Sequence, residues 1–198
     1  NADCNGGAFL DPCNICSAGS TGREPASTTD ENHDGIADAC HGPDLIVDVP
    51  YLEDHFSIDH VFISPNSCFI PDRCVTGAGN RKILRFGTKV ANLGNEDLAI
   101  GTGSGGNSYW TWNDCMEEYD YQDYAEYQLI DTETQEVAVF GRKYGFCVMD
   151  LAGYDLPASQ CDQYNCGNQG ITAGCSDIYV SSLDCQWIDI TNVADGTY

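Results

Sequence analysis

The sequence predicts an all-β, disulfide-rich domain with long loops, preceded by a small loop-rich module. Apolar residues make up 42% of the 198 residues, so a packed core is expected. Twelve cysteines beside only four histidines indicate a disulfide framework and an oxidising, extracellular compartment. From Pro43 onward, short apolar runs bounded by turn residues predict strands, and no amphipathic run of helical length stands out.

The charge of the chain excludes several classes of partner. Eight Lys and Arg residues stand against 31 Asp and Glu, which leaves a formal net charge of −23. Such a surface repels nucleic-acid phosphates and anionic lipids, whereas it attracts cations. No segment approaches the roughly 18 apolar residues of a membrane span. We therefore expect no nucleic-acid partner and no membrane insertion, and a secreted or cell-surface location.

The chain divides into two segments of different composition. Residues 1–42 are rich in Cys, Gly and Asp and lack apolar periodicity, so disulfides or metal ions must order them. Residues 43–198 have the texture of a β domain. The expected strands are residues 45–49, 82–91, 97–102, 109–115, 124–131, 137–149 and 185–191, and the stretch 147–179 is expected to be a long loop.

The first segment contains a calcium-binding pattern. Oxygen-bearing side chains recur at every second position and Gly35 permits the turn, as in the first half of a calcium loop. The predicted ligands are Asp30, Asn32, Asp34, the carbonyl of Ile36 and Asp38. His41 stands where an EF-hand has its acidic twelfth residue, so the run instead resembles a thrombospondin type 3 repeat. The alternative is an acidic, solvated loop.

The second segment carries several separated motifs in a characteristic order. They are GPDL at 42–45, ILRF at 83–86, VANLG at 90–94, WNDC at 112–115, GRKYGFC at 141–147, CSDIY at 175–179 and LDCQWIDIT at 183–191. On these motifs, residues 43–198 resemble a lysyl oxidase domain. The resemblance implies a disulfide-rich lysyl-oxidase-like β-sandwich.

The resemblance also locates a copper site, and here the sequence departs from the family. Lysyl oxidases bind copper through three histidines in the run Cys-His-x-His-Tyr-His, and the aligned positions hold Met116, Glu118 and Asp120. On a strand these residues share one face, but carboxylates suit hard ions rather than Cu(II). Copper is therefore not expected, and Glu118 and Asp120 form a tentative hard-ion site.

The resemblance places Lys143 and Tyr179 at the positions of the pair that copper converts to lysine tyrosylquinone. Without copper this cofactor has no evident route of formation, so the pair is expected to be degenerate and no catalytic residue is assigned. The alternative role of Lys143 is an ion pair with Glu118 or Asp120. Trp112, Tyr119 and Trp187 are expected to be core aromatics.

The twelve cysteines are expected to form six disulfides. The resemblance implies the pairs Cys68–Cys74, Cys115–Cys166, Cys147–Cys161 and Cys175–Cys185. Cys4, Cys13, Cys16 and Cys40 then pair within the first segment. Spacing does not choose among their three possible pairings, and Cys4–Cys13 with Cys16–Cys40 is our working hypothesis.

Three classes of function remain. The first is a secreted calcium-binding structural protein, a pseudoenzyme with an inactive lysyl-oxidase-like fold. The others are a copper and quinone amine oxidase acting on lysine, and a calcium-dependent adhesion module. The resemblance implies that the family continues past Val193, through a Gly turn, into a further strand, whereas this sequence ends at Tyr198. An open sheet edge there would recruit another copy by strand addition into a homopolymeric filament. The alternative is that the chain is a fragment of a longer protein.

Overall fold

The structure is a computed structural model that describes most of the chain. The described residues are 4, 7–11, 13, 15–21, 24–25, 28, 42–103, 109–114, 117–121, 124–142 and 147–198, without the side chains of Ser20, Glu118, Asp120 and Arg142. None of the helices in these ranges has the length and apolar character that a bilayer span requires.

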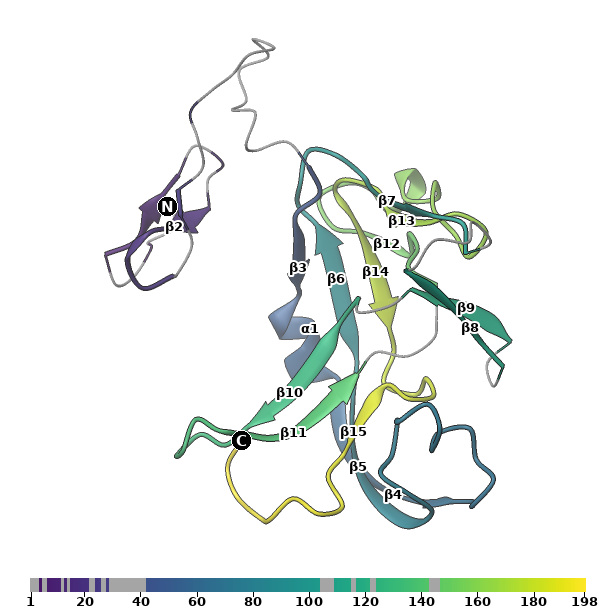
Figure 1. Cartoon of the computed structure of the whole chain (residues 1–198). Helices are drawn as coiled ribbons and strands as arrows, with labels where there is room; N and C mark the ends of the chain where they lie inside the picture. Colours follow the sequence, from purple (N-terminus) through teal and green to yellow (C-terminus); the bar gives the residue numbers. More distant parts are fainter. Residues whose placement is uncertain are drawn as a thin grey trace.

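Nearly all regular structure is β (Figure 1). The elements are β1 (Phe9–Leu10), β2 (Cys16–Ser17), β3 (Leu45–Val47), α1 (Val49–Asp54), β4 (Phe56–Ile63), β5 (Gly79–Phe86), β6 (Thr88–Asn92), β7 (Leu98–Gly101), β8 (Trp110–Asn113), β9 (Glu118–Tyr121), β10 (Glu126–Ile130), β11 (Val137–Arg142), β12 (Ala152–Gly153), β13 (Gln169–Ile171), β14 (Cys175–Tyr179) and β15 (Trp187–Asp189), with 3₁₀ turns at Gly19–Thr21 and Ala158–Gln160. The predicted all-β, disulfide-rich fold class is confirmed.

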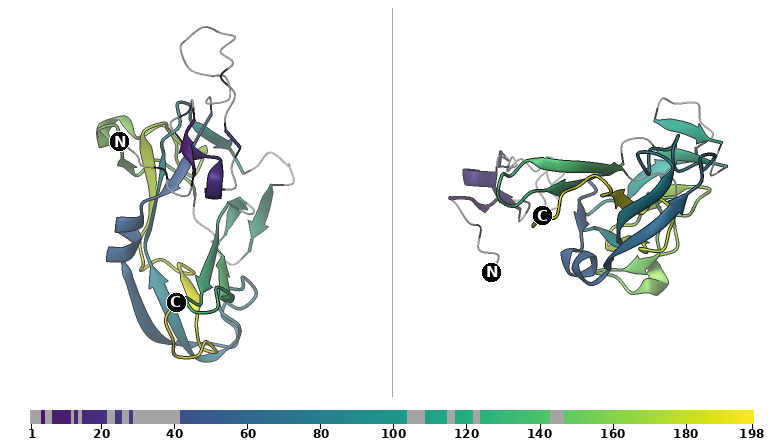
Figure 2. Two further views of the ribbon diagram at one scale, coloured as in Figure 1. Left: turned by 90° about the vertical axis from the view of Figure 1, so that its left-hand side faces the viewer. Right: turned by 90° about the horizontal axis from the view of Figure 1, so that it is seen from below.

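The strands form small antiparallel sheets rather than two continuous ones. The two larger sheets have the orders β12-β14-β6-β3 and β15-β5-β4, and the β10–β11 hairpin packs over β5 and β15 as a second layer (Figure 2). Phe86 and Ile188 are buried beneath Tyr127, Leu129 and Val139 of the hairpin. This packing gives the domain its two-layered character.

A second core cluster surrounds the indole of Trp187, which is only 3% exposed. Its ring N–H donates to the carbonyl of Cys74 (2.9 Å), its face lies under the guanidinium of Arg85 (4.6 Å), and Phe69 meets it edge-on. The Cys74–Cys185 disulfide closes this cluster across 111 residues of sequence. Trp187 is thus confirmed as a core aromatic.

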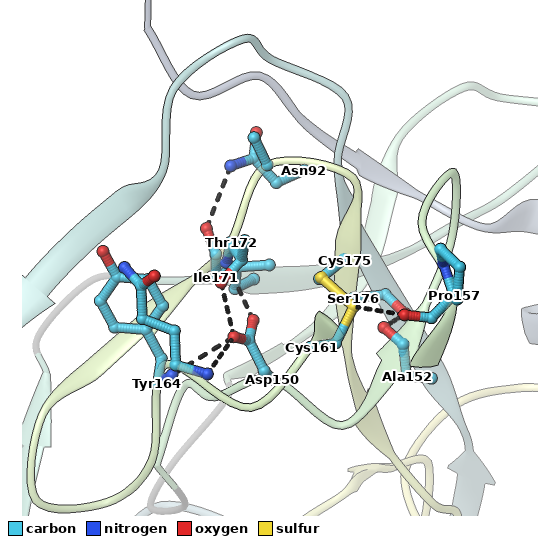
Figure 3. Close-up of a disulfide and its surroundings, with 12 residues drawn as sticks. Asn92, Asp150, Ala152, Pro157, Cys161, Tyr164, Ile171, Thr172, Cys175 and Ser176 are labelled. Carbon is cyan, nitrogen blue, oxygen red and sulfur yellow. Dashed lines mark hydrogen bonds between the residues drawn. A yellow bond between two sulfur atoms is a disulfide. The ribbon is translucent and has the colours of Figure 1, made fainter. Parts of the chain in front are cut away.

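A third cluster organises the long stretch after residue 147 around a buried carboxylate (Figure 3). Asp150 accepts hydrogen bonds from the backbone amides of Gln163, Tyr164 and Thr172 (2.8–3.2 Å) and from the Thr172 hydroxyl (2.6 Å). The Cys161–Cys175 disulfide joins the same stretch to β14. This segment was expected to be a loop, yet it contributes β12, β13 and the central strand β14.

Several expected strands have different bounds. The run 82–91 is two strands, because Gly87 brings the backbone against α1, where an added Cβ would meet Tyr51 and the Cβ of His55 at 3.0 and 3.1 Å. The helix α1 itself was not expected. The carboxylate of Asp48 caps it by accepting from the Tyr51 amide (3.1 Å), and its six residues are too few to show an apolar period.

The expected disulfide pairing is wrong, both for the four pairs implied by the resemblance and for the working hypothesis on the first segment. The structure instead pairs Cys4–Cys16, Cys74–Cys185, Cys147–Cys166 and Cys161–Cys175, which excludes Cys68–Cys74, Cys115–Cys166, Cys147–Cys161, Cys175–Cys185, Cys4–Cys13 and Cys16–Cys40. Cys175 lies on β14 whereas Cys185 lies in the cluster around Trp187, so each bonds a cysteine of its own cluster. Cys13 and Cys68 are also disulfide-bonded, and no described cysteine is a free thiol.

In the first segment, β1 pairs with β2 and the connecting turn is held by Asp11, which is 5% exposed. Its carboxylate accepts from the amides of Cys13 (2.9 Å) and Ile15 (3.1 Å) and from the hydroxyl of Ser17 (2.7 Å). A buried carboxylate therefore organises this turn as another organises the stretch around Asp150.

Asp189 provides a test of these carboxylate centres. It accepts from the amide and hydroxyl of Thr76 (2.8 Å each) and from Thr191, and these hydrogen bonds lower its pKa although burial alone would raise it. Asp189→Asn should lower the free energy of unfolding at pH 7 by about 1–3 kcal/mol. Because the folded pKa is depressed, the difference should shrink as the pH falls below about 4.

Chemical denaturation at pH 7 and pH 3 measures this difference. The matched control is Asp195→Asn, whose fully exposed carboxylate is 3.6 Å from Lys82 and should change little. A loss of equal size for both variants would contradict the structural role of Asp189.

Candidate functional site

Tyr179, the described member of the predicted cofactor pair, ends the central strand β14. The Cys-Ser-Asp-Ile-Tyr run is buried at four of its five positions, and Tyr179 is only 2% exposed. Its phenol donates a hydrogen bond to the carbonyl of Cys147 (3.1 Å). Burial and the neighbouring carboxylate of Asp177 raise its pKa well above the ordinary value. The phenol is therefore neutral at physiological pH.

Asp177 lies two residues earlier on the same strand and is completely buried. Two further tyrosines, Tyr124 and Tyr127, lie close enough for its charge to act on them. Burial is the main reason that the pKa of each is raised, and the Asp177 carboxylate raises both further. For Tyr127, hydrogen bonding with Gln186 and Thr88 opposes the increase. The site is thus a buried carboxylate among three neutral phenols.

An apolar groove of about 870 Å³ opens over this cluster. One wall is α1 with the start of β4, the other is β10, and the floor comes from β5 and β6. Leu52, Phe56 and Leu129 are among its apolar lining residues, and Tyr124 and Tyr179 reach it from the cluster. Its ionisable carboxylates are Glu53 and Glu126, and no Lys, Arg or His is found among the described lining residues. Such a groove suits an apolar occupant.

The strand to which the resemblance assigns the copper ligands is present as β9, paired with β8. Residues 118 and 120 both lie on it, whereas their side chains and residues 115–116 lie outside the described part of the structure. Trp112 and Tyr119 pair across the two strands with ring centroids 5.0 Å apart, but they are 48% and 42% exposed. Their expected place in the core is therefore wrong: β8 and β9 form a two-stranded sheet of their own, and these two rings stay half-exposed on it.

Other predicted site residues are also outside the described ranges. These are the calcium ligands Asp30, Asn32, Asp34, Ile36 and Asp38, together with Lys143 and the cysteines Cys40 and Cys115. Among the residues that are described, no three His, Cys, Asp or Glu side chains converge on a metal-sized site. Both metal sites and the Lys143–Tyr179 pair therefore stay predictions.

The fold agrees with the comparison with known families. The sequence model described as lysyl oxidase matches residues 48–198. The chain belongs to the lysyl oxidase family. This places the β domain, β14 and the Tyr179 cluster within the lysyl oxidase domain.

Individual lysyl oxidase relatives are similar over most of this chain. Lysyl oxidase homolog 3A of Danio rerio is 31% identical over 164 residues, which are 78% of this chain and 22% of that protein. Lysyl oxidase homolog 4 of Homo sapiens is 30% identical over 176 residues, covering 83% of this chain and 22% of that protein. The chain therefore spans less than a quarter of the length of these relatives.

Sequence reasoning found Tyr179 but missed its surroundings. Neither Tyr124 nor Asp177 was singled out. For Asp177 the reason is that an acidic residue in a run of mixed polarity indicates an exposed position. The available signal was the strand period: in Cys-Ser-Asp-Ile-Tyr, positions 175, 177 and 179 must share a face. A cysteine and a tyrosine on that face could have indicated that the aspartate between them is buried.

The hydrogen bond of Tyr179 can be tested by its removal. Tyr179→Phe leaves the Cys147 carbonyl without this donor and should lower the free energy of unfolding by about 1–2 kcal/mol. Tyr119→Phe, which alters a 42% exposed ring, is the matched control and should change it by less than about 0.5 kcal/mol. Equal effects in urea denaturation would show that the buried phenol has no structural role.

Proposed function

We propose that this chain is a secreted, calcium-binding structural protein that keeps the lysyl oxidase fold without the oxidase chemistry and associates with itself. The observation that carries this proposal is the donor set on the copper strand. By the resemblance, Met116, Glu118 and Asp120 stand at the positions of three imidazoles, and all four histidines of the chain precede residue 61. A strand at this position, β9, supports a change of ligands rather than of fold.

This donor set does not fit copper. Imidazole is a strong ligand for Cu(II), whereas carboxylate oxygens favour hard ions and a single thioether adds little. Of the described histidines, His55 donates a hydrogen bond from Nδ1 to the Tyr51 carbonyl (2.7 Å), and its ring stacks on the Tyr51 ring. His60 lies on β4 opposite Lys82. Neither strand β8 nor β9 pairs with these elements among the described sheets.

Tyr179 has a structural reason to be retained. Its ring fills the space beside Asp177, and its hydroxyl satisfies the Cys147 carbonyl next to the Cys147–Cys166 disulfide. The tyrosine therefore contributes to packing whether or not it is ever oxidised. Its presence alone supports neither quinone formation nor amine oxidation.

Calcium and secretion are supported by the remaining features of the sequence. Thirty-one acidic residues beside eight basic ones need cations to screen them, and the run from Asp30 to Asp38 has calcium-loop spacing. Disulfides throughout the described ranges are typical of extracellular proteins.

A second candidate function is an amine oxidase, which is favoured by one observation: Lys143 and Tyr179 are both present at the family positions. Hydrogen peroxide released from amines by copper-loaded protein, and lost in Lys143→Ala, would establish this activity and overturn the first proposal.

Restoring imidazole ligands tests the copper argument directly. The variant Met116→His/Glu118→His/Asp120→His should bind Cu(II) at least about 100-fold more tightly than the parent chain, because three imidazoles replace poor copper ligands. The matched control places three histidines with the same spacing on β10, at Glu126, Gln128 and Ile130. Tight copper binding by the unmodified protein, measured by isothermal titration and elemental analysis, would contradict the proposal.

Removing two of the predicted calcium ligands tests the calcium-binding part of the proposed function. Asp30→Asn/Asp34→Asn should weaken calcium binding and expose the chain near residues 30–38 to proteolysis in millimolar calcium, because the sequence of the first segment lacks the apolar periodicity of a core that could order it. The control Asp155→Asn/Asp162→Asn removes the same charge from exposed positions of the β domain. Identical calcium affinity and cleavage patterns for both variants would exclude this loop as the site.

A further inference from the structure

Strand β4 presents an open sheet edge of eight residues. It is the terminal strand of the sheet β15-β5-β4, and within the described part of the chain no strand pairs with its other side. On β5, the Lys82 carbonyl accepts a hydrogen bond from the Ile190 amide, just beyond the end of β15. The backbone N–H and C=O groups of the even-numbered β5 residues therefore point toward β15. The odd-numbered residues of β5 therefore bond the odd-numbered residues of β4. The backbone groups of Phe56, Ile58, His60 and Phe62 consequently point outward.

Three of these four residues form an exposed apolar surface. Phe56, Ile58 and Phe62 are 63%, 55% and 72% exposed, and all three lie on the face of β4 that continues from the apolar groove. Long apolar edge strands are normally shortened, bulged or protected by charged side chains. Strand β4 has none of these protections on this face.

The charge around β4 differs from that of the whole chain. Strands β4 and β5 carry three basic residues and a single acid, Asp59, in a chain of net charge −23. That acid is paired with Arg85 (2.9 Å), whereas Arg81 and Lys82 are 3.9 and 3.6 Å from Asp189 and Asp195. Two copies can therefore meet at this ribbon without bringing unpaired carboxylates together.

We propose that β4 is the self-association surface, and that it pairs antiparallel with β4 of a second copy about a two-fold axis. Centring the pair on Asp59 uses the whole strand and sets Phe56 opposite Phe62 of the second copy, and Ile58 opposite His60. All four outward-facing residues then form main-chain hydrogen bonds in both copies. The aromatic pairs form on the exposed face, where cross-strand aromatic contacts stabilise sheets.

This proposal rests on the self-association included in the proposed function and specifies its surface. A two-fold contact closes into a dimer of two three-stranded sheets. A filament would then need a second contact elsewhere on the molecule.

Two charge variants test both the surface and its register. Phe56→Lys/Phe62→Glu places Lys opposite Glu in both symmetric positions, whereas Phe56→Lys/Phe62→Lys places Lys opposite Lys. The Lys/Lys variant should dimerise about tenfold more weakly than the Lys/Glu variant. Because extra positive charge reduces the repulsion between two strongly negative chains, nonspecific association predicts the opposite order.

Sedimentation velocity over a concentration series, in millimolar calcium with the full chain, supplies the measurement, and circular dichroism confirms that both variants fold. Association of the parent chain with the expected order of the variants supports the proposal. Association that is indifferent to both variants overturns the β4 surface and leaves self-association intact. A parent chain that stays monomeric at every concentration overturns both.

Discussion

Buried carboxylates hold turns and loops of this fold together. Asp11, Asp150 and Asp189 are satisfied mainly by N–H and O–H donors, in a chain that has only eight Lys and Arg residues. Asp11 holds a turn of the first segment, Asp150 gathers three amides from the stretch after residue 147, and Asp189 joins β15 to Thr76. Each centre fixes a turn or loop through several hydrogen bonds to one carboxylate, which helps a β domain with long connections keep one shape.

Asp177 is the buried carboxylate at the heart of the domain, and its neighbours are phenols. Burial, and then the charge of Asp177, keep the pKa values of Tyr124, Tyr127 and Tyr179 high, so these phenols stay neutral. The groove above them is apolar and lacks basic residues among its described lining. We propose that this cluster is structural, because the resemblance places Met116, Glu118 and Asp120 at the copper positions.

Composition and local pattern predicted the class of fold, because they depend on short-range properties of the sequence. The turn-bounded apolar runs gave β3, β7, β8, β10 and β11 to within a few residues, apart from an overlong end to β11. Strand β4 was missed although Phe56, Ile58 and Phe62 alternate clearly, and β14 was missed because its Ser and Asp suggested exposure. The disulfides could not be predicted, since Cys74 and Cys185 are 111 residues apart in the sequence and lie together through tertiary contacts such as the pairing of β5 with β15. The metal ligands lie where the structure gives no test.

The central claim is that the lysyl oxidase fold persists here without formation of its quinone. Peptide mapping by mass spectrometry of the native, secreted protein, with disulfides reduced, tests this most directly. The account predicts separate peptides that carry unmodified Lys143 and unmodified Tyr179. A single cross-linked species joining the two peptides, with the mass of an oxidised lysine–tyrosine bond, would contradict it.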